Sequence, residues 1–557
     1  MEKIPKKKAK IVNFRSEKKT LKKVLRNLLI TLIFGAIYFY IALPPINLKS
    51  ERFYGFFLLL SVVYCLLSIF SFASIRSTDD FKTSWQQIKK TCAAPLLACT
   101  ALLLLFIIGG LLSSVILRSG SYKELMTVTP GDFAADVQEI SYNKIPMLDK
   151  ASAERLGDRK LGELEDMVSQ FEVSSLYSQI NYKGRPVRVT YLEYGDLFKW
   201  FNNFGDGLPA YIVIDMVTQN VDVVRLEEGM KYSVGDHFGR YLGRYLRFNY
   251  PTFIFDTPGF EIDENGDPWW VCPRIIKTIG LFGGTDIDGA VLVNAVTGEH
   301  QYYHADEVPT WVDRVYSADL LISQYDYYGQ YQRGFLNSLF GQQGVTVTTS
   351  GYNYIALDDD VYVYTGITSV GGDESNIGFI LSNQRTKETR YYSCAGAEEY
   401  SAMDSAEGMV QHLGYRSTFP LLLNISGQPT YFIALKDNAG LVKMYAMVNV
   451  QQYNIVSTGA TLAECEANYH KLMLQNHVFS DSSDTDSTFE GRVEDIRTAV
   501  IDGNSYYFIK LAGHAQYWRI SAADNELVVV LNVGDEVRIV STDASDGIRQ
   551  AISIERK

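Results

Sequence analysis

The chain has 557 residues, a formal net charge of -12 and 47% hydrophobic residues. This length is too great for one hydrophobic core and predicts about three or four domains. Residues 1–118 contain 18 Lys and Arg against 5 Asp and Glu, a net +13, which leaves -25 for the remainder. The two parts therefore face different surroundings, and we expect no nucleic-acid partner.

Three apolar runs lie near the N-terminus, at residues 27–48, 53–75 and 91–117, and none contains a charged residue. Each reaches the roughly 20 residues that a transmembrane helix needs. The basic tail 1–26 holds 11 Lys and Arg, the first short loop holds 2 and the second holds 4. Because Lys and Arg remain on the cytoplasmic side, we expect three transmembrane helices within 27–118, a cytoplasmic N-terminus and an extracellular position for the residues after about 118.

Only Cys272, Cys394 and Cys465 lie in the predicted exported part. A disulfide-rich scaffold would show dense, even-numbered spacing, so we expect buried free thiols.

Residues 119–146 form a polar connector, and an amphipathic helical pattern follows between Leu148 and Met167. From about residue 180 the chain is rich in β-branched and aromatic residues punctuated by Gly, Asp and Asn, which favours antiparallel sheets in an α+β region over 147–479. A pattern of strand, turn and strand recurs in this region as an irregular internal repeat. Its copies are expected at 209–224, 290–303, 378–392 and 429–445.

The hairpin at 290–303, with its Thr297-Gly-Glu299 turn, resembles that of PepSY-type domains of exported bacterial proteins. The whole chain also resembles multi-pass envelope proteins of Firmicutes, Gram-positive bacteria, through its three-span plan and segments 263–270 and 351–354. That second resemblance brings no known activity with it. PepSY domains are associated with inhibiting or chaperoning peptidases and with envelope sensing, so the first resemblance implies a binding role.

Residues 480–488 contain no apolar residue and predict a flexible acidic linker. Short alternating strands over 489–557 then predict a small β-barrel of OB-like or SH3-like type. This segment has 8 Lys and Arg against 11 Asp and Glu, so protein contact is favoured over nucleic acid.

The histidines of the sequence His300-Gln-Tyr-Tyr-His304 have the spacing of a helical metal site, but the preceding turn favours a strand. On a strand they would lie about 13 Å apart, too far to share one metal ion. The acidic stretches Asp263–Asp267 and Asp358–Asp360 offer oxygen ligands for Ca²⁺, yet they are typical first of hairpin turns. We therefore expect no metal site, no cofactor and no assigned catalytic residue.

Tyrosine is unusually frequent, with 37 copies. It suits recognition surfaces because it supplies contact area at little entropic cost, although alternating tyrosines are also ordinary strand residues. The predicted binding surface consists of Trp269, Trp270, Tyr325, Tyr327, Tyr328, Tyr331, Tyr352 and Tyr354.

No signature of nucleophilic catalysis is present, but a glycosidase needs only two carboxylates whose separation a sequence does not show. The sequence therefore predicts a non-enzymatic, membrane-anchored envelope protein that contacts membrane lipid and presents β-rich modules to another envelope protein or a cell-wall polymer. The alternative is an exported hydrolase that acts on cell-wall glycan or peptide.

Overall fold

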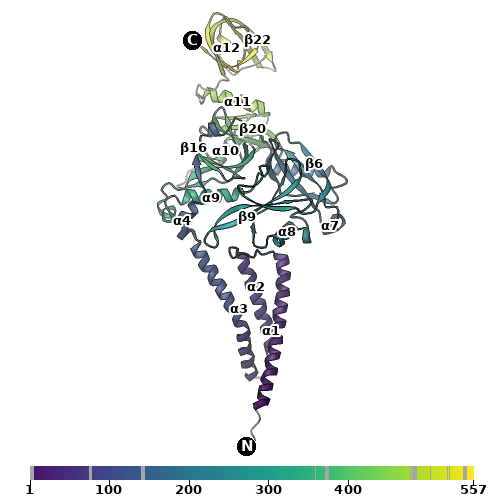
Figure 1. Cartoon of the computed structure of the whole chain (residues 1–557). Coiled ribbons are helices and arrows are strands. Elements are labelled where there is room, and N and C mark those ends of the chain that lie inside the picture. Colours follow the sequence, from purple (N-terminus) through teal and green to yellow (C-terminus); the bar gives the residue numbers. More distant parts are fainter. Residues whose placement is uncertain are drawn as a thin grey trace. The chain divides into compact units, whose positions relative to one another are not determined.

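The computed structural model describes residues 6–73, 78–139, 145–357, 359–370, 375–476, 478, 486–501, 504–522, 525, 527–542 and 548–557. Two compact units are present (Figure 1). The first comprises Met1–Asp132 and Asn143–Glu398, and the second comprises Phe133–Tyr142 and Glu399–Lys557.

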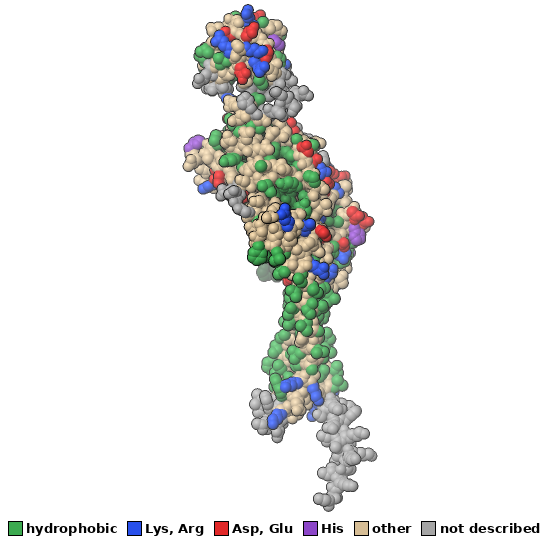
Figure 2. Space-filling view, turned by 90° about the vertical axis from the view of Figure 1, so that its left-hand side faces the viewer, with side chains coloured by type: hydrophobic (Ala, Val, Ile, Leu, Met, Phe, Trp, Pro, Cys, Tyr) green, Lys and Arg blue, Asp and Glu red, His purple; other side chains and the backbone are tan. Residues whose placement is uncertain are grey.

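Three long apolar helices begin the first unit: α1 (Lys6–Ala42), α2 (Glu51–Phe72) and α3 (Thr78–Leu112). Within them, residues 19–42, 51–72 and 82–112 are long and apolar enough to cross a membrane, which confirms the three predicted apolar helices. α1 ends where Leu43 adopts a positive φ of 50° before two prolines. α3 ends five residues before the expected 117, because a separate helix, α4 (Val115–Lys123), follows. Figure 2 shows the apolar surface of the helices, with Lys and Arg at the end far from the sheets.

Four copies of one module follow, each a helix and then five strands. In every copy two short strands pair with the first long strand, which is followed in the sheet by the second long strand and the last strand. All these pairings are antiparallel, as predicted. Module 1 is α6 (Lys150–Gly162), β2 (Phe171–Val173), β3 (Ser178–Tyr182), β4 (Arg185–Tyr194), β5 (Leu208–Asp215) and β6 (Val221–Met230), with α7 (Leu197–Asn203) inserted after β4. Module 2 is α8 (Leu242–Asn249), β7 (Ile254–Phe255), β8 (Gly259–Ile262), β9 (Pro268–Ile279), β10 (Gly283–Asn294) and β11 (His300–His304). Module 3 is α9 (Ala318–Gln330), β12 (Thr346–Thr348), β13 (Asn353–Leu357), β14 (Asp360–Ser369), β15 (Ser375–Asn383) and β16 (Thr389–Ala397). Module 4 is α10 (Glu399–Met409), β17 (Arg416–Ser417), β18 (Leu421–Ile425), β19 (Gln428–Lys436), β20 (Val442–Asn449) and β21 (Val456–Gly459), followed by α11 (Leu462–Gln475).

The module boundaries correct one predicted repeat. The hairpins expected at 209–224, 290–303 and 378–392 are the last two strands of modules 1, 2 and 3. The copy expected at 429–445 is β19–β20, one hairpin too early, and its true counterpart is β20–β21. Asp437 and Gly440 form a tight turn there, which imitates the pattern of the later hairpin.

One turn chemistry closes the last hairpin of modules 1, 2 and 3. The side chain of Asp215, Asn294 or Asn383 accepts hydrogen bonds from the backbone N–H groups two and three residues later. A residue of positive φ follows in each turn: Gln219 at 61°, Gly298 at 76° and Lys387 at 68°. The carboxamide or carboxylate thus replaces sheet hydrogen bonds that the turning backbone loses.

Both faces of the module 2 sheet are buried. Trp270, Cys272 and Val291 lie in one apolar core with module 1, whereas their neighbours Val271 and Leu292 lie in another with α9 and module 3. This alternation follows from the two-residue period of a strand. Cys272, Cys394 and Cys465 are buried and free, as predicted.

The second unit contains module 4, a short segment with α5 (Phe133–Asp136), and a C-terminal sheet. Asn424 Nδ2 donates to Val137 O at 2.6 Å, which joins this segment to module 4. The C-terminal sheet is made of β22 (Asp486–Ile501), β23 (Asn504–Leu511), β24 (Tyr517–Ser521), β25 (Glu536–Thr542) and β26 (Ile548–Arg556), with the short helix α12 (Leu527–Val530). The sheet is curled around Trp518 in the order β22-β23-β24-β26-β25, and β25 also pairs with β22. Of the predicted linker 480–488, residues 480–485 lie outside the described part, and β22 begins at Asp486.

Candidate functional site

The eight aromatic residues of the predicted binding surface do not form an exposed patch. Trp270, Tyr325 and Tyr331 are buried, and the other five, Trp269, Tyr327, Tyr328, Tyr352 and Tyr354, are half-buried. Trp270 Nε1 donates to Tyr232 O at 2.8 Å within the core that modules 1 and 2 share. Six of the rings pack in the cores shared between modules, and Tyr327 and Tyr331 pack against Tyr122 of α4, because aromatic side chains contribute large apolar areas to cores. Binding through the half-buried rings stays a prediction.

The predicted turns and the histidine strand are present. Asp263 Oδ1 accepts from the N–H groups of Asn265 and Asp267 in the turn between β8 and β9. His300 and His304 lie on β11, and His300 Nδ1 lies 2.8 Å from the Tyr250 hydroxyl. Among the described residues no three His, Cys, Asp or Glu side chains are grouped as a metal site would require. Asp358 lies outside the described residues.

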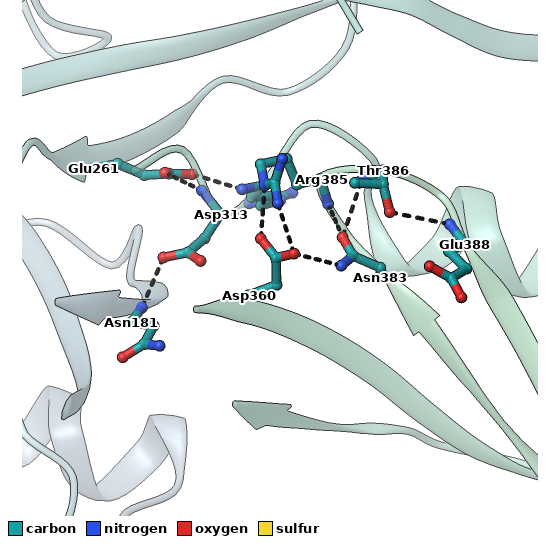
Figure 3. A network of polar contacts seen from close by, with 9 residues as sticks. Asn181, Glu261, Asp313, Asp360, Asn383, Arg385, Thr386 and Glu388 are labelled. Atoms are coloured by element: carbon teal, nitrogen blue, oxygen red, sulfur yellow. Dashed lines mark hydrogen bonds and ion pairs between the residues drawn. The ribbon is translucent and has the colours of Figure 1, made fainter. Parts of the chain in front are cut away.

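A buried acidic network joins modules 1, 2 and 3 (Figure 3). Glu261 of β8 is fully buried, and its two carboxylate oxygens accept the backbone N–H groups of Asp313 and Arg314 at 2.9 and 3.1 Å. Asp313 is 2% exposed, and its Oδ2 accepts the N–H of Asn181 on β3 at 2.7 Å. Three segments distant in sequence thus meet at two carboxyl groups.

The module 3 side of this network is an ion pair. Arg385 donates to both oxygens of Asp360 at 2.6 and 2.8 Å, and Asn383 Nδ2 donates to Asp360 at 2.7 Å (Figure 3). A forked guanidinium–carboxylate contact of this kind fixes orientation as well as distance.

The charge state of the carboxyl pair follows from burial. Burial raises the pKa of Glu261 to about 7, and burial together with the charge of Glu261 raises the pKa of Asp313 well above its ordinary range. A proton is best placed on Asp313 Oδ1, which has no hydrogen-bond partner, because both oxygens of Glu261 already accept N–H groups. Raised pKa values are typical of acid catalysts, but these groups are closed off from solvent and hold the modules together.

A basic pocket of about 500 Å³ lies where the end of α1 and the start of α2 meet module 2. Its lining includes the cations Lys49, Arg52, Arg247 and Lys277 against the anions Glu51 and Asp256. Apolar side chains complete the lining, including Ile41, Leu43, Leu246 and Phe282. A volume within 300–1,000 Å³ that combines apolar walls with a few charged groups is typical of ligand sites.

Arg247 is the buried cation of this pocket, with 7% of its surface exposed. Its guanidinium donates to the carbonyl oxygens of Leu43, Tyr250, Pro251 and Phe253 at 2.6 to 3.3 Å. No carboxylate of the described residues is ion-paired with it. Burial, and then the charge of Arg52, lowers the pKa of Arg247 to about 10, so this site lacks a matching negative charge.

Module 2 is also tied to the other membrane helices. The backbone N–H groups of Leu281 and Phe282, at the tip of the β9–β10 hairpin, donate to Ser113 Oγ just after α3. The Phe282 ring packs against Tyr54 of α2 and Phe106 of α3, with centroids 5.6 and 5.0 Å apart. The pocket therefore sits on a fixed junction between the spans and the modules.

The last strand of each module forms a sheet edge, and one of these edges is occupied. In module 3, β1 (Val128–Pro130) pairs in parallel with β16. Within the described residues, β6, β11 and β21 of the other modules pair on one side only. An open edge presents backbone N–H and C=O groups to which a further strand can bind.

Sequence reasoning missed Glu261, Asp313, Arg247 and Lys277. An acidic residue inside an apolar strand, as in Gly-Phe-Glu-Ile at 259–262, was the available signal for Glu261. No sequence signal marked the pocket cations Arg247 and Lys277, because single basic residues are ordinary on protein surfaces.

No protein-family model matches the chain, and no curated protein matches it. Among solved structures, the C-terminal domain of YpeB from Bacillus megaterium is 10% identical over 40% of this chain and 93% of that one, with a TM-score of 0.10. A levansucrase mutant from B. megaterium is 9% identical over 78% of this chain and 97% of that one, with a TM-score of 0.18. Likenesses this weak assign neither a fold nor a family to the chain.

Proposed function

We propose that this chain is a membrane-anchored protein of a Gram-positive cell envelope, which presents its modules outside the cytoplasm to bind another protein. The excess of Lys and Arg before α1 and between α2 and α3 supports this orientation. The hairpin at 290–303, formed by β10 and β11, resembles that of PepSY-type domains in sequence, and this resemblance supports a binding role.

The occupied edge of module 3 carries the proposal. β1 extends the sheet of this module with a segment far away in the sequence, as a peptide ligand does in strand addition. Of the edges open on one side, β6 carries Asp222, Arg225, Glu227 and Glu228, and charges of this kind protect an edge from pairing. Neither β11, His-Gln-Tyr-Tyr-His, nor β21, Val-Ser-Thr-Gly, carries Asp, Glu, Lys or Arg, and β11 is the longer acceptor with five residues against four. The partner is therefore a protein with an extended, mainly uncharged segment.

The C-terminal sheet enters the proposal as a small OB-like or SH3-like barrel. Its support is that β22 pairs with both β23 and β25, so the sheet curls back on itself. Its acidic balance favours a protein partner over nucleic acid.

A photo-crosslinking amino acid at the exposed Gln301 of β11, in the full chain in its native membrane, tests the proposal. We expect a defined adduct with one envelope protein. The matched control places the same group at Arg390 of β16, whose edge β1 already occupies, and should give no such adduct. Equal adducts from both positions would contradict strand addition.

Two further experiments distinguish a protein partner from a wall polymer and from hydrolase activity. Co-sedimentation of the purified full chain with cell walls, without any protein adduct, would replace the protein partner by a wall polymer. Release of soluble wall fragments by the purified chain would overturn the binding function in favour of the exported hydrolase.

A further inference from the structure

We infer that the basic pocket between α1, α2 and module 2 binds the phosphate group of an anionic phospholipid, in the leaflet nearest the modules. This site is separate from the strand edges of the proposed function and needs only that the three helices span a membrane.

The pocket lies at the level where lipid headgroups begin. α1 ends at Ala42 and α2 begins at Glu51, and both ends line the pocket. The tip residue Phe282 also lines it while packing between α2 and α3. One wall is therefore continuous with the membrane-spanning surface, and the other belongs to module 2.

Aromatic residues mark the same level. The guanidinium of Arg244 lies 4.1 Å from the ring centroid of Tyr40 and also donates to Tyr40 O. The Phe248 ring packs against Phe39 at 5.9 Å and remains 57% exposed. Aromatic rings are enriched at membrane–water boundaries, where an apolar body meets a polar layer.

Exposed apolar side chains continue from this rim onto α7. Arg244 also donates to Phe238 O, and the Phe238 ring contacts Trp200 of α7 at 5.5 Å. On this surface Phe198 is 80% exposed and Phe201 is 53% exposed. A group of exposed phenylalanines beside the membrane spans fits insertion into the interfacial layer, which would hold the pocket mouth among headgroups.

The excess of positive charge in the pocket lining favours an anionic ligand. Lys277 is half-buried and donates to Thr285 Oγ1 at 2.6 Å, and Lys49 donates to Lys277 O at 2.6 Å. Of the two lining carboxylates, Asp256 already accepts the Thr257 N–H and the Ser317 hydroxyl. The guanidinium of the exposed Arg52 makes no hydrogen bond or ion pair with the described residues and is available.

A phosphate group suits the Arg and Lys side chains of this pocket better than the carboxylates that line it do. Arg binds phosphate oxygens with two parallel N–H groups, and Lys adds a compact charge. In a phospholipid these cations would meet the phosphodiester, while the apolar lining would meet the first methylene groups of the acyl chains. Free inorganic phosphate has the same charge chemistry but would leave those apolar contacts unused.

Native mass spectrometry of the detergent-solubilised full chain tests the site, with dioleoyl phosphatidylglycerol titrated against dioleoyl phosphatidylcholine. We expect one phosphatidylglycerol to bind more tightly than phosphatidylcholine. R52Q and K277Q should each weaken that binding about fivefold, the effect of roughly one basic charge near an anionic surface. R118Q is the matched control, because Arg118 is an exposed arginine after α3, outside the pocket, and should leave affinity unchanged.

The outcomes are distinguishable. Equal affinity for the two lipids, or equal losses in R52Q and R118Q, would overturn the inference. Displacement of the lipid by millimolar inorganic phosphate would assign the site to free phosphate and overturn the lipid source. Unchanged thermal unfolding of R52Q shows that its loss of binding is not a loss of folding, and the crosslink from Gln301 reports separately on the proposed function.

Discussion

At the scale of single residues, the buried pair Asp313 and Glu261 makes a defined contribution to the pH dependence of folding. Two carboxyl groups this deeply buried cannot both be charged at low cost, and their raised pKa values express that. A carboxyl group whose pKa rises on folding stabilises the folded state below its unfolded pKa of about 4, and this contribution is lost as pH rises through the folded pKa.

D313N should therefore change the pH dependence of stability. Asn imitates the protonated carboxyl, and its side-chain oxygen can still accept the Asn181 N–H. We expect the apparent unfolding temperature of D313N, measured from pH 5 to 9, to rise relative to the unmodified chain as pH increases. D313A, which lacks that acceptor, should be less stable at every pH. Parallel curves for D313N and the unmodified chain would place the proton elsewhere.

At the scale of elements, the turn that recurs in modules 1, 2 and 3 allows the energy of backbone strain to be measured apart from that of side-chain contacts. Gln219 and Lys387 occupy the position where module 2 has Gly298, and both have positive φ, which costs an L-residue about 1–2 kcal/mol. They differ because Lys387 Nζ donates to both oxygens of Asp286 at 2.8 Å.

Q219G and K387G should accordingly have opposite effects. Q219G relieves the backbone strain, but glycine also gives the unfolded chain more conformational freedom. The net effect should be a stabilisation by about 0.5 kcal/mol. K387G gains the same relief but loses a half-buried ion pair and should be destabilised by about 1 kcal/mol. Thermal unfolding of the two variants measures the difference, and stabilisation of both would mean that the pair with Asp286 contributes nothing.

The junction of α3 with the β9–β10 tip offers a second test at this scale. A Cβ at Gly109 would lie 2.6 Å from Leu281 Cδ1 and 3.2 Å from the Phe282 ring, whereas a Cβ at Gly110 would meet nothing within 4 Å. G109A should loosen the hydrogen bonds from Leu281 and Phe282 to Ser113 and raise amide exchange there about fivefold, the equivalent of about 1 kcal/mol. G110A, one residue along the same helix, is the control and should exchange like the unmodified chain.

At the scale of the whole molecule, the three spans and the direction of insertion set which compartment the modules occupy. Glu264 in the β8–β9 turn and Gln86 in α3, before the third apolar run, are both exposed and report from opposite ends of the spans. The native Cys272, Cys394 and Cys465 of the modules are buried, whereas Cys65 of α2 and Cys99 of α3 are half-buried, so the chain without an added cysteine measures the background labelling.

Thiol labelling of intact cells should therefore distinguish E264C from Q86C. An impermeant reagent is expected to label E264C directly and Q86C only after permeabilisation, because the proposed orientation, drawn from the Lys and Arg of the flanks, places Gln86 in the cytoplasm. The reverse pattern would place the modules in the cytoplasm and remove the envelope function.

The sequence by itself determined the features that depend on neighbours along the chain. The spans follow from uninterrupted apolar runs, the hairpins from alternation of residue types, and the Asp263 turn from Asn-Gly chemistry, all within about 25 residues. The same local patterns misplaced the fourth hairpin, because Asp437 and Gly440 also form a turn. They could not show that Trp270 and Tyr325 point inward, since alternation does not reveal which face of a sheet is covered.

Only the tertiary structure decided which distant residues meet. Asp313 binds Asn181 across 132 residues, Arg247 binds Leu43 across 204, and Ser113 binds Leu281 across 168. The repeated module became visible as four sheets of one strand order, not as similar residues. The pocket and the acidic network arise where modules and helices pack, and their charges are set by burial, which no segment possesses until its neighbours in space have covered it.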